Sequence, residues 1–244
     1  MATLNNKIIL ITGASSGIGE ATARLLAANG ATLVLGARRT EKLELIAEDI
    51  QASGGKAVVK ELDVTQKESM NAFVAFAKES FGRVDVLINN AGVMPLSPMS
   101  ALKIDEWDKM IDVNVRGVLH GIAAVLPIME SQGFGHLINV ASIGAHVVVP
   151  TGAVYCATKY AVWAISEGLR QESKNLRVTT ICPGVVETEL GLDITDNTAA
   201  GALKEYRKIS LTPDAIARGV LYALSQPNDV DVNEIIIRPT TSAF

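Results

Sequence analysis

Short apolar runs alternate with stretches of helical period along most of the chain, and no other feature of the sequence limits its fold as strongly. The N-terminal half has apolar runs at 7–11, 32–36, 57–62 and 84–88, with helical patterns at 20–29, 40–52 and 66–80 between them. Continuous apolar runs are typical of strands buried on both faces, and strands that alternate with helices form parallel sheets. We therefore predict a doubly wound α/β fold with helices on both faces of a parallel sheet.

The C-terminal half continues the same alternation. Helical patterns cover 104–131, 153–173 and 213–226, and strands are predicted at 136–140, 177–182 and 234–238, which brings the sheet to seven strands. A chain of 244 residues with 48% hydrophobic content can bury one large core, so we predict a single domain over 1–244. Residues 189–210 show neither period. We predict an irregular, flexible loop there.

A glycine-rich turn separates the first predicted strand from the first helix. It reads Thr12-Gly13-Ala-Ser-Ser-Gly17-Ile18-Gly19. Glycines let the backbone approach a diphosphate closely, and the free N–H groups at a helix start favour negative charge. The spacing differs from the commoner Gly-x-Gly-x-x-Gly of dinucleotide sites, and alone it also fits an ordinary turn between a strand and a helix.

Further polar residues stand where other predicted strands end, at Arg38, at Asp63 and at 89–92. Ligands of parallel sheets lie beyond the carboxyl ends of the strands. We therefore predict a small-molecule site at this edge of the sheet.

Tyr155 and Lys159 stand four residues apart on the predicted helix 153–173, after an apolar run that ends at Ser142. Residues at this spacing are neighbours on a helix, so the ammonium of Lys159 can lie near the phenol of Tyr155. An adjacent cation favours the phenolate, so we predict that Lys159 lowers the pKa of Tyr155 from its usual value of about 10 and prepares it for proton transfer. Such a pair also arises by chance on surface helices.

Asn114 lies among apolar neighbours on the predicted helix 104–131. A buried amide must be satisfied, so we predict a local hydrogen-bonding role for Asn114, whether or not it is catalytic.

Charge and composition exclude several classes of function. A net charge of −4 and a pI near 5.5 argue against a nucleic-acid-binding protein. Cys156 and Cys182 make no disulfide framework, the three histidines are scattered, and no metal site is predicted. No apolar run approaches the roughly 18 residues of a membrane span. We expect a soluble, cytoplasmic protein that acts on small molecules, with no membrane partner.

Six motifs occur in the order, and at roughly the intervals, of the short-chain dehydrogenase/reductase family, which the chain resembles over essentially its whole length. They are the glycine-rich turn, Asn89-Asn90-Ala91-Gly92, Asn114, Ser142, Tyr155-x-x-x-Lys159 and Pro183-Gly184. The resemblance implies a Rossmann-type fold and an oxidoreductase that uses NADPH to reduce a ketone or aldehyde to an alcohol, reversibly, by hydride transfer.

The resemblance also implies roles for single residues. Tyr155 would protonate the carbonyl oxygen, Ser142 would donate a hydrogen bond to it, Lys159 would bind the nicotinamide ribose, and Asn114 would hold a water that links the lysine to solvent. The residues implied in cofactor binding are Gly13, Ser15, Ser16, Gly17, Ile18, Gly19, Arg38, Arg39, Asp63, Val64, Asn90, Ala91, Gly92, Tyr155, Lys159, Pro183, Gly184, Val186 and Thr188. Two alternatives stay open: Asp63 also fits a plain strand end, and Asn89 is expected to cross-link the sheet.

The residues after the second predicted strand favour NADP(H) over NAD(H). NAD-selective sites place a carboxylate there for the ribose hydroxyls, whereas this chain has Ala37 followed by Arg38 and Arg39. A guanidinium is a planar, permanently charged partner for the 2′-phosphate, and we assign this role first to Arg38. Arg39 either covers the adenine or points to solvent. The alternative is that both arginines are only solvated, although cations at a helix start face the unfavourable end of the dipole.

The implied substrate pocket is mostly apolar, with no arginine or lysine ready for a carboxylate or phosphate. The residues expected there are Val93, Met94, Pro95, Ile143, Gly144, Ala145, His146, Val147, Val149, Val185 and Leu190. His146 is the polar exception, and we expect a solvent-facing or structural role for it. The last strand lacks the Gly-Gly of acyl-carrier-protein ketoreductases and is more similar to broad-range carbonyl reductases and hydroxy-acid dehydrogenases, which leaves the substrate open.

Two other functions fit the same scaffold. A catalytically silent NADP-binding sensor would have no need for the four catalytic residues together. A nucleotide-sugar epimerase or dehydratase usually carries a longer C-terminal substrate domain than the segment after Pro183 here.

Helices 104–131 and 153–173 carry apolar residues around much of their circumference, more than one core-facing stripe needs. The examples are Trp107, Leu119, Val125, Val162, Trp163 and Ile165. We expect these helices to meet another subunit. By resemblance the assembly is a homotetramer, or otherwise a dimer.

Overall fold

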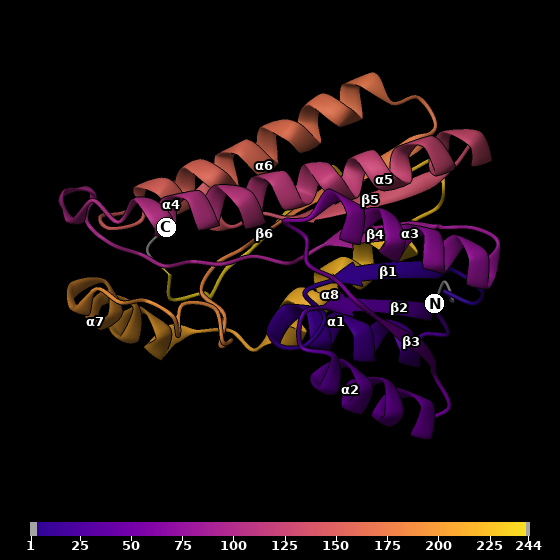
Figure 1. Cartoon of the computed structure of the whole chain (residues 1–244), viewed down its shortest axis with the longest axis horizontal. Helices are drawn as coiled ribbons and strands as arrows, with labels where there is room; N and C mark the ends of the chain where they lie inside the picture. The colour runs from indigo at the N-terminus through magenta and orange to yellow at the C-terminus, as the bar shows by residue number, and fades with distance from the viewer. Residues whose placement is uncertain (1–3, 243–244) are drawn as a thin grey trace.

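Seven parallel strands form one sheet in the order β3-β2-β1-β4-β5-β6-β7, which confirms the predicted doubly wound architecture (Figure 1). The strands are β1 (Ile8–Thr12), β2 (Thr32–Ala37), β3 (Lys56–Glu61), β4 (Val86–Asn89), β5 (Gly135–Val140), β6 (Leu176–Pro183) and β7 (Glu234–Ile237). The structure is a computed structural model that describes residues 4–242, so the ends of the predicted domain, 1–3 and 243–244, lie outside the described residues.

Helices cover both faces of this sheet (Figure 1). One face carries α1 (Gly17–Ala28), α2 (Thr40–Ala52) and α8 (Pro213–Ser225), and the other carries α3 (Lys67–Phe81), α5 (Gly117–Gln132) and α6 (Ala153–Glu172). Successive side chains of a strand point to opposite faces. Ile9 and Ile11 of β1 therefore enter the first core, while Ile8 and Leu10 enter the second. This division explains why the strands read as continuous apolar runs.

The order of the strands fixes where a ligand can bind. β1 pairs with β2 on one side and with β4 on the other. The connection from β1 to β2 and the connection from β4 to β5 therefore run over opposite faces of the sheet. A crevice opens at such a reversal, outside the carboxyl ends of the strands. The glycine-rich turn that follows β1 lies at this point.

The predicted helix 104–131 exists but is not uniform. It consists of α4 (Ile104–Ile111), a π-helical segment (Asp112–Arg116) and α5, and Asn114 lies in the middle of the π-helical segment. A π-bulge shifts the register of a helix and is frequent at functional sites. Here it helps to bring Asn114 against the loop that follows β4.

The expectation that no apolar run approaches a membrane span is contradicted in part: the helical stretch Ile104–Gln132 has 29 residues and contains an 18-residue window with a mean hydropathy of 1.4, long and apolar enough to cross a membrane by length and composition. A helix that flanks a protein core passes the same test of length and composition. In this chain Val118, Ile122, Val125 and Met129 pack into the second core.

The prediction of an irregular loop at 189–210 was also wrong. The segment contains α7 (Asn197–Tyr206) and a 3₁₀ turn (Arg207–Ile209). Asp196 caps α7 by accepting a hydrogen bond from the Ala199 N–H at 2.9 Å. The side chain of Ala199 is buried in a third, smaller apolar cluster with Leu96, Met110 and Tyr155.

Candidate active site

A cavity of about 750 Å³ lies beyond the carboxyl ends of the strands. Its walls come from the glycine-rich turn, from the segments after β2 to β6, from α6 and from the α7 segment. Every residue expected in cofactor binding lines it except Gly19. The cavity therefore collects expected cofactor residues as far apart in the sequence as Gly13 and Thr188, because the sheet brings the ends of its parallel strands together.

The glycine-rich turn has the shape that a diphosphate needs. Gly13 and Gly17 have φ angles of +65° and +56°, which L side chains rarely adopt, and a Cβ atom on Gly13 would lie 2.8 Å from Ala91 Cα. Ser16 precedes α1 and makes no side-chain cap, so the start of the helix has room for an anion. The turn fits the pyrophosphate of a dinucleotide.

Gly19 does not line the cavity, unlike the other residues expected in cofactor binding. A Cβ atom at this position would lie 2.4 Å from Gly13 O and 2.6 Å from Asn90 Nδ2. The glycine is needed for close packing of α1 against its own turn.

The loop after β4 supports the turn. Asn90 Nδ2 donates to Thr12 O at 2.9 Å and to Gly13 O at 3.1 Å, and Thr12 Oγ1 accepts from the Asn90 and Ala91 N–H groups. The amide of Asn90 therefore holds the turn. Asn89 donates to Asn139 Oδ1 at 2.9 Å, the cross-link between β4 and β5 that was expected.

Asp63 lines the cavity beside Val64 and also ends its strand. Its Oδ1 accepts from the Thr65 N–H at 2.9 Å and from Thr65 Oγ1 at 2.7 Å. This is an Asx-type turn, so the strand-end alternative for Asp63 has direct structural support.

The segment after β6 exposes backbone groups to the cavity. Leu211 bonds the backbone of Val185 and Glu187 at 3.0 and 2.9 Å. Backbone groups of successive extended residues point in opposite directions, so those of Val186 point away from Leu211. Thr188 Oγ1 accepts from the Leu190 N–H at 3.2 Å.

Ser142, Tyr155 and Lys159 line the same cavity. Lys159 Nζ lies 5.7 Å from the centre of the Tyr155 ring and donates to Val140 O at 3.0 Å. Ser142 Oγ accepts from the Gly144 N–H at 3.0 Å, which leaves the hydroxyl proton of Ser142 free to be donated elsewhere. The helical spacing and the strand end thus bring the three side chains together.

The predicted lowering of the Tyr155 pKa was wrong for the protein without cofactor. Burial raises the pKa of Tyr155 to about 12, against an opposing effect of the Ser142 hydroxyl. Burial also lowers the pKa of Lys159 to about 8. Both residues are buried, and removal from water disfavours the charged form of each. Tyr155 is therefore a protonated donor at neutral pH.

Asn114 is buried behind the cavity, 1% exposed, and its amide is satisfied as predicted. Oδ1 accepts from the Val93 N–H at 2.9 Å, and Nδ2 donates to Val93 O at 3.0 Å and to Thr158 Oγ1 at 3.1 Å. A Cβ atom on Gly92 would lie 3.4 Å from Asn114 Oδ1 and 3.7 Å from Lys159 Nζ. Asn114 therefore holds the backbone of the cavity wall close to the lysine.

Comparison with known proteins shows which family has this fold and these motifs. The sequence matches the family model of the short chain dehydrogenases over residues 7–199. The chain belongs to the short-chain dehydrogenase/reductase family. It is 51% identical over 249 residues to an uncharacterized oxidoreductase of Staphylococcus saprophyticus, with 100% of both chains covered.

Two solved structures of the family resemble this short-chain dehydrogenase over nearly the whole chain. An alcohol dehydrogenase from the archaeon Thermococcus sibiricus, complexed with 5-hydroxy-NADP, has a TM-score of 0.88 and 36% identity, with 98% of both chains covered. A short-chain dehydrogenase/reductase from Burkholderia phymatum, in complex with NAD, has a TM-score of 0.88 and 27% identity, with 97% of this chain and 90% of that chain covered. The protein is thus an oxidoreductase with the fold of nicotinamide-dependent enzymes.

The substrate end of the cavity departs in part from expectation. Val93, Met94, Ile143, Gly144, Val147, Val149, Val185 and Leu190 line it. Ala145 and His146 do not, and neither does Pro95. Ala145 is buried in the second core because the short 3₁₀ turn 143–145 directs it toward the sheet.

His146 has a structural environment. Its Nε2 lies 2.7 Å from Glu234 Oε1, the oxygen that also accepts from Cys182 Sγ at 3.2 Å. Potential metal-binding atoms of these three residues lie within 4.8 Å of one another, a cluster that the scattered sequence positions did not predict. One carboxylate oxygen joins the imidazole and the thiol, so the contact ties the loop after β5 to the start of β7.

Several lining residues of this short-chain dehydrogenase were not predicted. They include Leu96, Cys156, Leu203, Tyr206 and Arg207. An arginine, Arg207, lines the cavity, and its Nη2 donates to two backbone carbonyls, Thr188 O at 3.0 Å and Leu190 O. Most of these residues come from the α7 segment. The only local signal is Asp196, a favourable N-cap residue that precedes Ala199 and Ala200.

Proposed function

We propose that the protein is an NADPH-dependent carbonyl reductase that converts a ketone or aldehyde to an alcohol, reversibly. The observation that carries this proposal is that Ser142, Tyr155 and Lys159 face the same cavity as a glycine-rich turn shaped for a diphosphate. The substrate end of this cavity is mostly apolar, which favours a substrate with hydrocarbon groups beside its carbonyl.

The side chains of the chain supply the proton and the electrostatic part of the reaction. A bound nicotinamide cofactor supplies the hydride. The Ser142 hydroxyl and the Tyr155 phenol are placed to donate to the carbonyl oxygen as negative charge develops on it. Tyr155 then transfers its proton to that oxygen. Lys159 holds a positive charge near the phenol, and Asn114 fixes the cavity wall beside the lysine.

The test is a panel of aldehydes, ketones and diketones with NADPH, and of the matching alcohols with NADP⁺. We expect oxidation of NADPH with at least one class of small carbonyl compound. A purified protein that binds NADPH but consumes none with any member of the panel would instead support the silent sensor. Interconversion of nucleotide-sugars without net change in cofactor would support an epimerase.

We propose NADP(H) rather than NAD(H) as the cofactor, because Arg38 and Arg39 follow β2 where NAD-selective sites have a carboxylate. Both arginines line the cavity, and within residues 4–242 Arg38 makes no hydrogen bond or ion pair. Removal of a hydrogen bond to a charged group costs about 1.5–3 kcal/mol. Arg38→Ala should therefore lower kcat/KM with NADPH by about one to two orders of magnitude, with little change for NADH. Ala37→Asp should shift the preference toward NADH.

Steady-state kinetics with both cofactors, in the wild type and the two variants, check this expectation. Equal use of NADH and NADPH by the wild type would contradict it. So would an unchanged ratio of the two kcat/KM values in both variants.

We also propose that the protein assembles as a homotetramer, or as a dimer, through α4, α5 and α6. Leu119 and Trp163 leave 43% and 37% of their surface exposed on this side, with Ile104 and Ile111 nearby on α4, whereas Val125 and Val162 face the core and are not available. In Figure 1, α5 and α6 are drawn on the same side of the sheet, and α4 and the π-helical segment pack against α6. A cytoplasmic location is part of the same proposal and rests on the resemblance to soluble enzymes.

Light scattering at micromolar concentration should give the mass of an oligomer. Leu119→Glu with Trp163→Glu should reduce the mass toward that of one chain, because two charges would be buried at the interface. Leu45→Glu is the matched control, since Leu45 is exposed on α2 at the other face. A monomeric wild type would contradict the proposal.

A further inference from the structure

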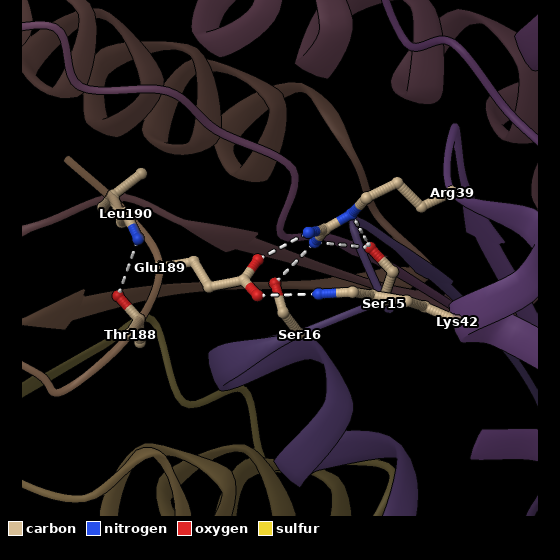
Figure 2. Close-up of polar contacts among 7 residues, drawn as sticks. All are labelled: Ser15, Ser16, Arg39, Lys42, Thr188, Glu189 and Leu190. Atoms are coloured by element: carbon tan, nitrogen blue, oxygen red, sulfur yellow. Dashed lines mark hydrogen bonds and ion pairs between the residues drawn. The ribbon is translucent and has the colours of Figure 1, made fainter. Parts of the chain in front are cut away.

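One carboxylate connects three segments that line the cavity (Figure 2). Glu189 lies in the segment after β6, and its Oε2 and Oε1 accept from Arg39 Nη1 at 2.6 Å and from Lys42 Nζ at 2.8 Å. Arg39 also donates to Ser15 Oγ at 3.0 Å and to Ser16 Oγ at 2.9 Å. Glu189 therefore joins the segment after β6 to the start of α2 and, through Arg39, to the glycine-rich turn.

These contacts form a site for an anion. An arginine and a lysine converge on the Glu189 carboxylate at the N-terminal end of α2, where the helix dipole also favours negative charge, and the hydroxyls of Ser15 and Ser16 hold the arginine by accepting from its Nη2. Glu189 remains ionised there, because hydrogen bonds from Lys42 and Arg39 lower its pKa to about 2. The site thus has an occupant that comes from the chain itself.

The same place is where the proposed function requires a phosphate. Arg39 stands next to Arg38, two residues after the end of β2, so both arginines lie in the segment that faces the adenosine ribose in a cofactor bound at the carboxyl ends of the strands. A phosphate carries more charge and more acceptor oxygens than a carboxylate, so it competes well for an arginine and a lysine. Glu189 and the 2′-phosphate of NADPH therefore need the same donors.

We propose that Glu189 is a built-in competitor for the 2′-phosphate of the cofactor. In the protein without cofactor its carboxylate holds Arg39 and Lys42, and NADPH must displace it, whereas NADH has no group that uses these donors. Glu189 then reduces the preference for NADPH that the arginines create. This inference rests on the proposed cofactor.

The size of the effect follows from the exposure of the pairs. Arg39, Lys42 and Glu189 leave 45%, 48% and 42% of their side chains exposed, and pairs with this exposure contribute little individually. Removing both ion pairs of Glu189 should lower the Kd for NADPH by about three- to tenfold. The Kd for NADH should stay within about twofold, because the competition concerns only the 2′-phosphate.

The experiment compares the full-length wild type with Glu189→Gln and with the control Glu187→Gln. Glu187 is exposed two residues earlier and makes no ion pair within the described part of the chain, so its variant removes the same charge without touching the site. Calorimetry gives Kd values for NADPH, NADH, 2′,5′-ADP and 5′-AMP. The last two probes carry only the adenosine end, with and without the 2′-phosphate.

We expect Glu189→Gln to bind NADPH and 2′,5′-ADP more tightly than the wild type does, with no comparable change for NADH and 5′-AMP. In Glu187→Gln the ratio of the Kd values for NADPH and NADH should stay at the wild-type value. Weaker or unchanged binding of NADPH would overturn the inference, since Glu189 would then support Arg39 in the complex. An equal gain for both cofactors would also overturn it, because the segment would act as a steric cover only. If the variants change the Kd values as expected but the wild type reduces no carbonyl compound, the proposed function would be rejected and the inference about Glu189 would stand.

Discussion

Replacing Tyr155 with phenylalanine should lower kcat for carbonyl reduction by about 10²–10⁴-fold, the usual contribution of a general acid. The ring stays, and it packs with Leu96, Met110, Cys156 and Ala199, so the fold should be retained. Only the proton donor is removed from the cavity. Thermal unfolding and the Kd for NADPH should both remain near the wild-type values.

The control for this variant is Tyr222→Phe, because Tyr222 lies on α8 with 56% of its surface exposed and outside the cavity. It should keep full activity. A Tyr155→Phe enzyme that retains near-complete turnover would remove Tyr155 from the mechanism, and a loss of activity that accompanies unfolding would show a structural role instead.

The pKa of Tyr155 adds a dependence on the direction of the reaction. Since this pKa is raised to about 12, the phenol keeps its proton at all pH values below that and is ready to donate it in reduction. Oxidation of an alcohol needs the phenolate, whose fraction rises about tenfold per pH unit below the pKa. The rate of alcohol oxidation should therefore increase with pH between about 7 and 10, while reduction should show no such increase. Rates measured in both directions across this range check the sign.

The fold could be predicted because its signals are local and repeated. The helix 40–52 was predicted with the boundaries that the structure shows, since its start and its Ser-Gly-Gly stop are both written in the sequence. The continuous apolar runs of the strands reflect two separate cores. Alternation of strands and helices then leaves few possible topologies.

The errors concern features that depend on tertiary contacts. α7 was missed because a short helix with Gly201 in its middle has a weak local signal and depends on packing against residues such as Met110. The partner of Arg39 lies 150 positions away at Glu189, so no local pattern could show it. The effect of Lys159 on Tyr155 was overestimated because spacing gives proximity but not the loss of water around both groups.

Replacing Lys159 with methionine should abolish most activity and at the same time make the protein more stable at neutral pH. Lys159 is 5% exposed and no carboxylate of residues 4–242 pairs with it; its hydrogen-bond acceptor is Val140 O. Burial lowers its pKa from 10.5 to about 8, which corresponds to roughly 3 kcal/mol of unfavourable burial of the charged form. Loss of the hydrogen bond offsets about 1 kcal/mol. We expect a net gain of about 1–2 kcal/mol in the free energy of unfolding at pH 7.

The gain in the free energy of unfolding of Lys159→Met should decrease as the pH rises. Below about pH 8 the lysine is charged in both the folded and the unfolded wild type, so the cost of burial is fully present. Between about 8 and 10.5 the unfolded chain binds more protons than the folded one, and the wild type therefore becomes more stable as the pH rises. The advantage of Lys159→Met should thus be largest at pH 6–8 and should disappear by about pH 10.5.

Urea unfolding at fixed protomer concentration across pH 6–10.5 tests this expectation, because assembly makes stability depend on concentration. Lys174→Met is the matched control, since Lys174 is exposed just after α6 and should give a small difference that does not vary with pH. A Lys159→Met protein that is less stable than the wild type at every pH would mean that the buried ammonium is well solvated or paired in the folded state. Greater stability combined with lost activity would show that the site keeps a desolvated cation beside Tyr155 for catalysis and at a cost to the fold.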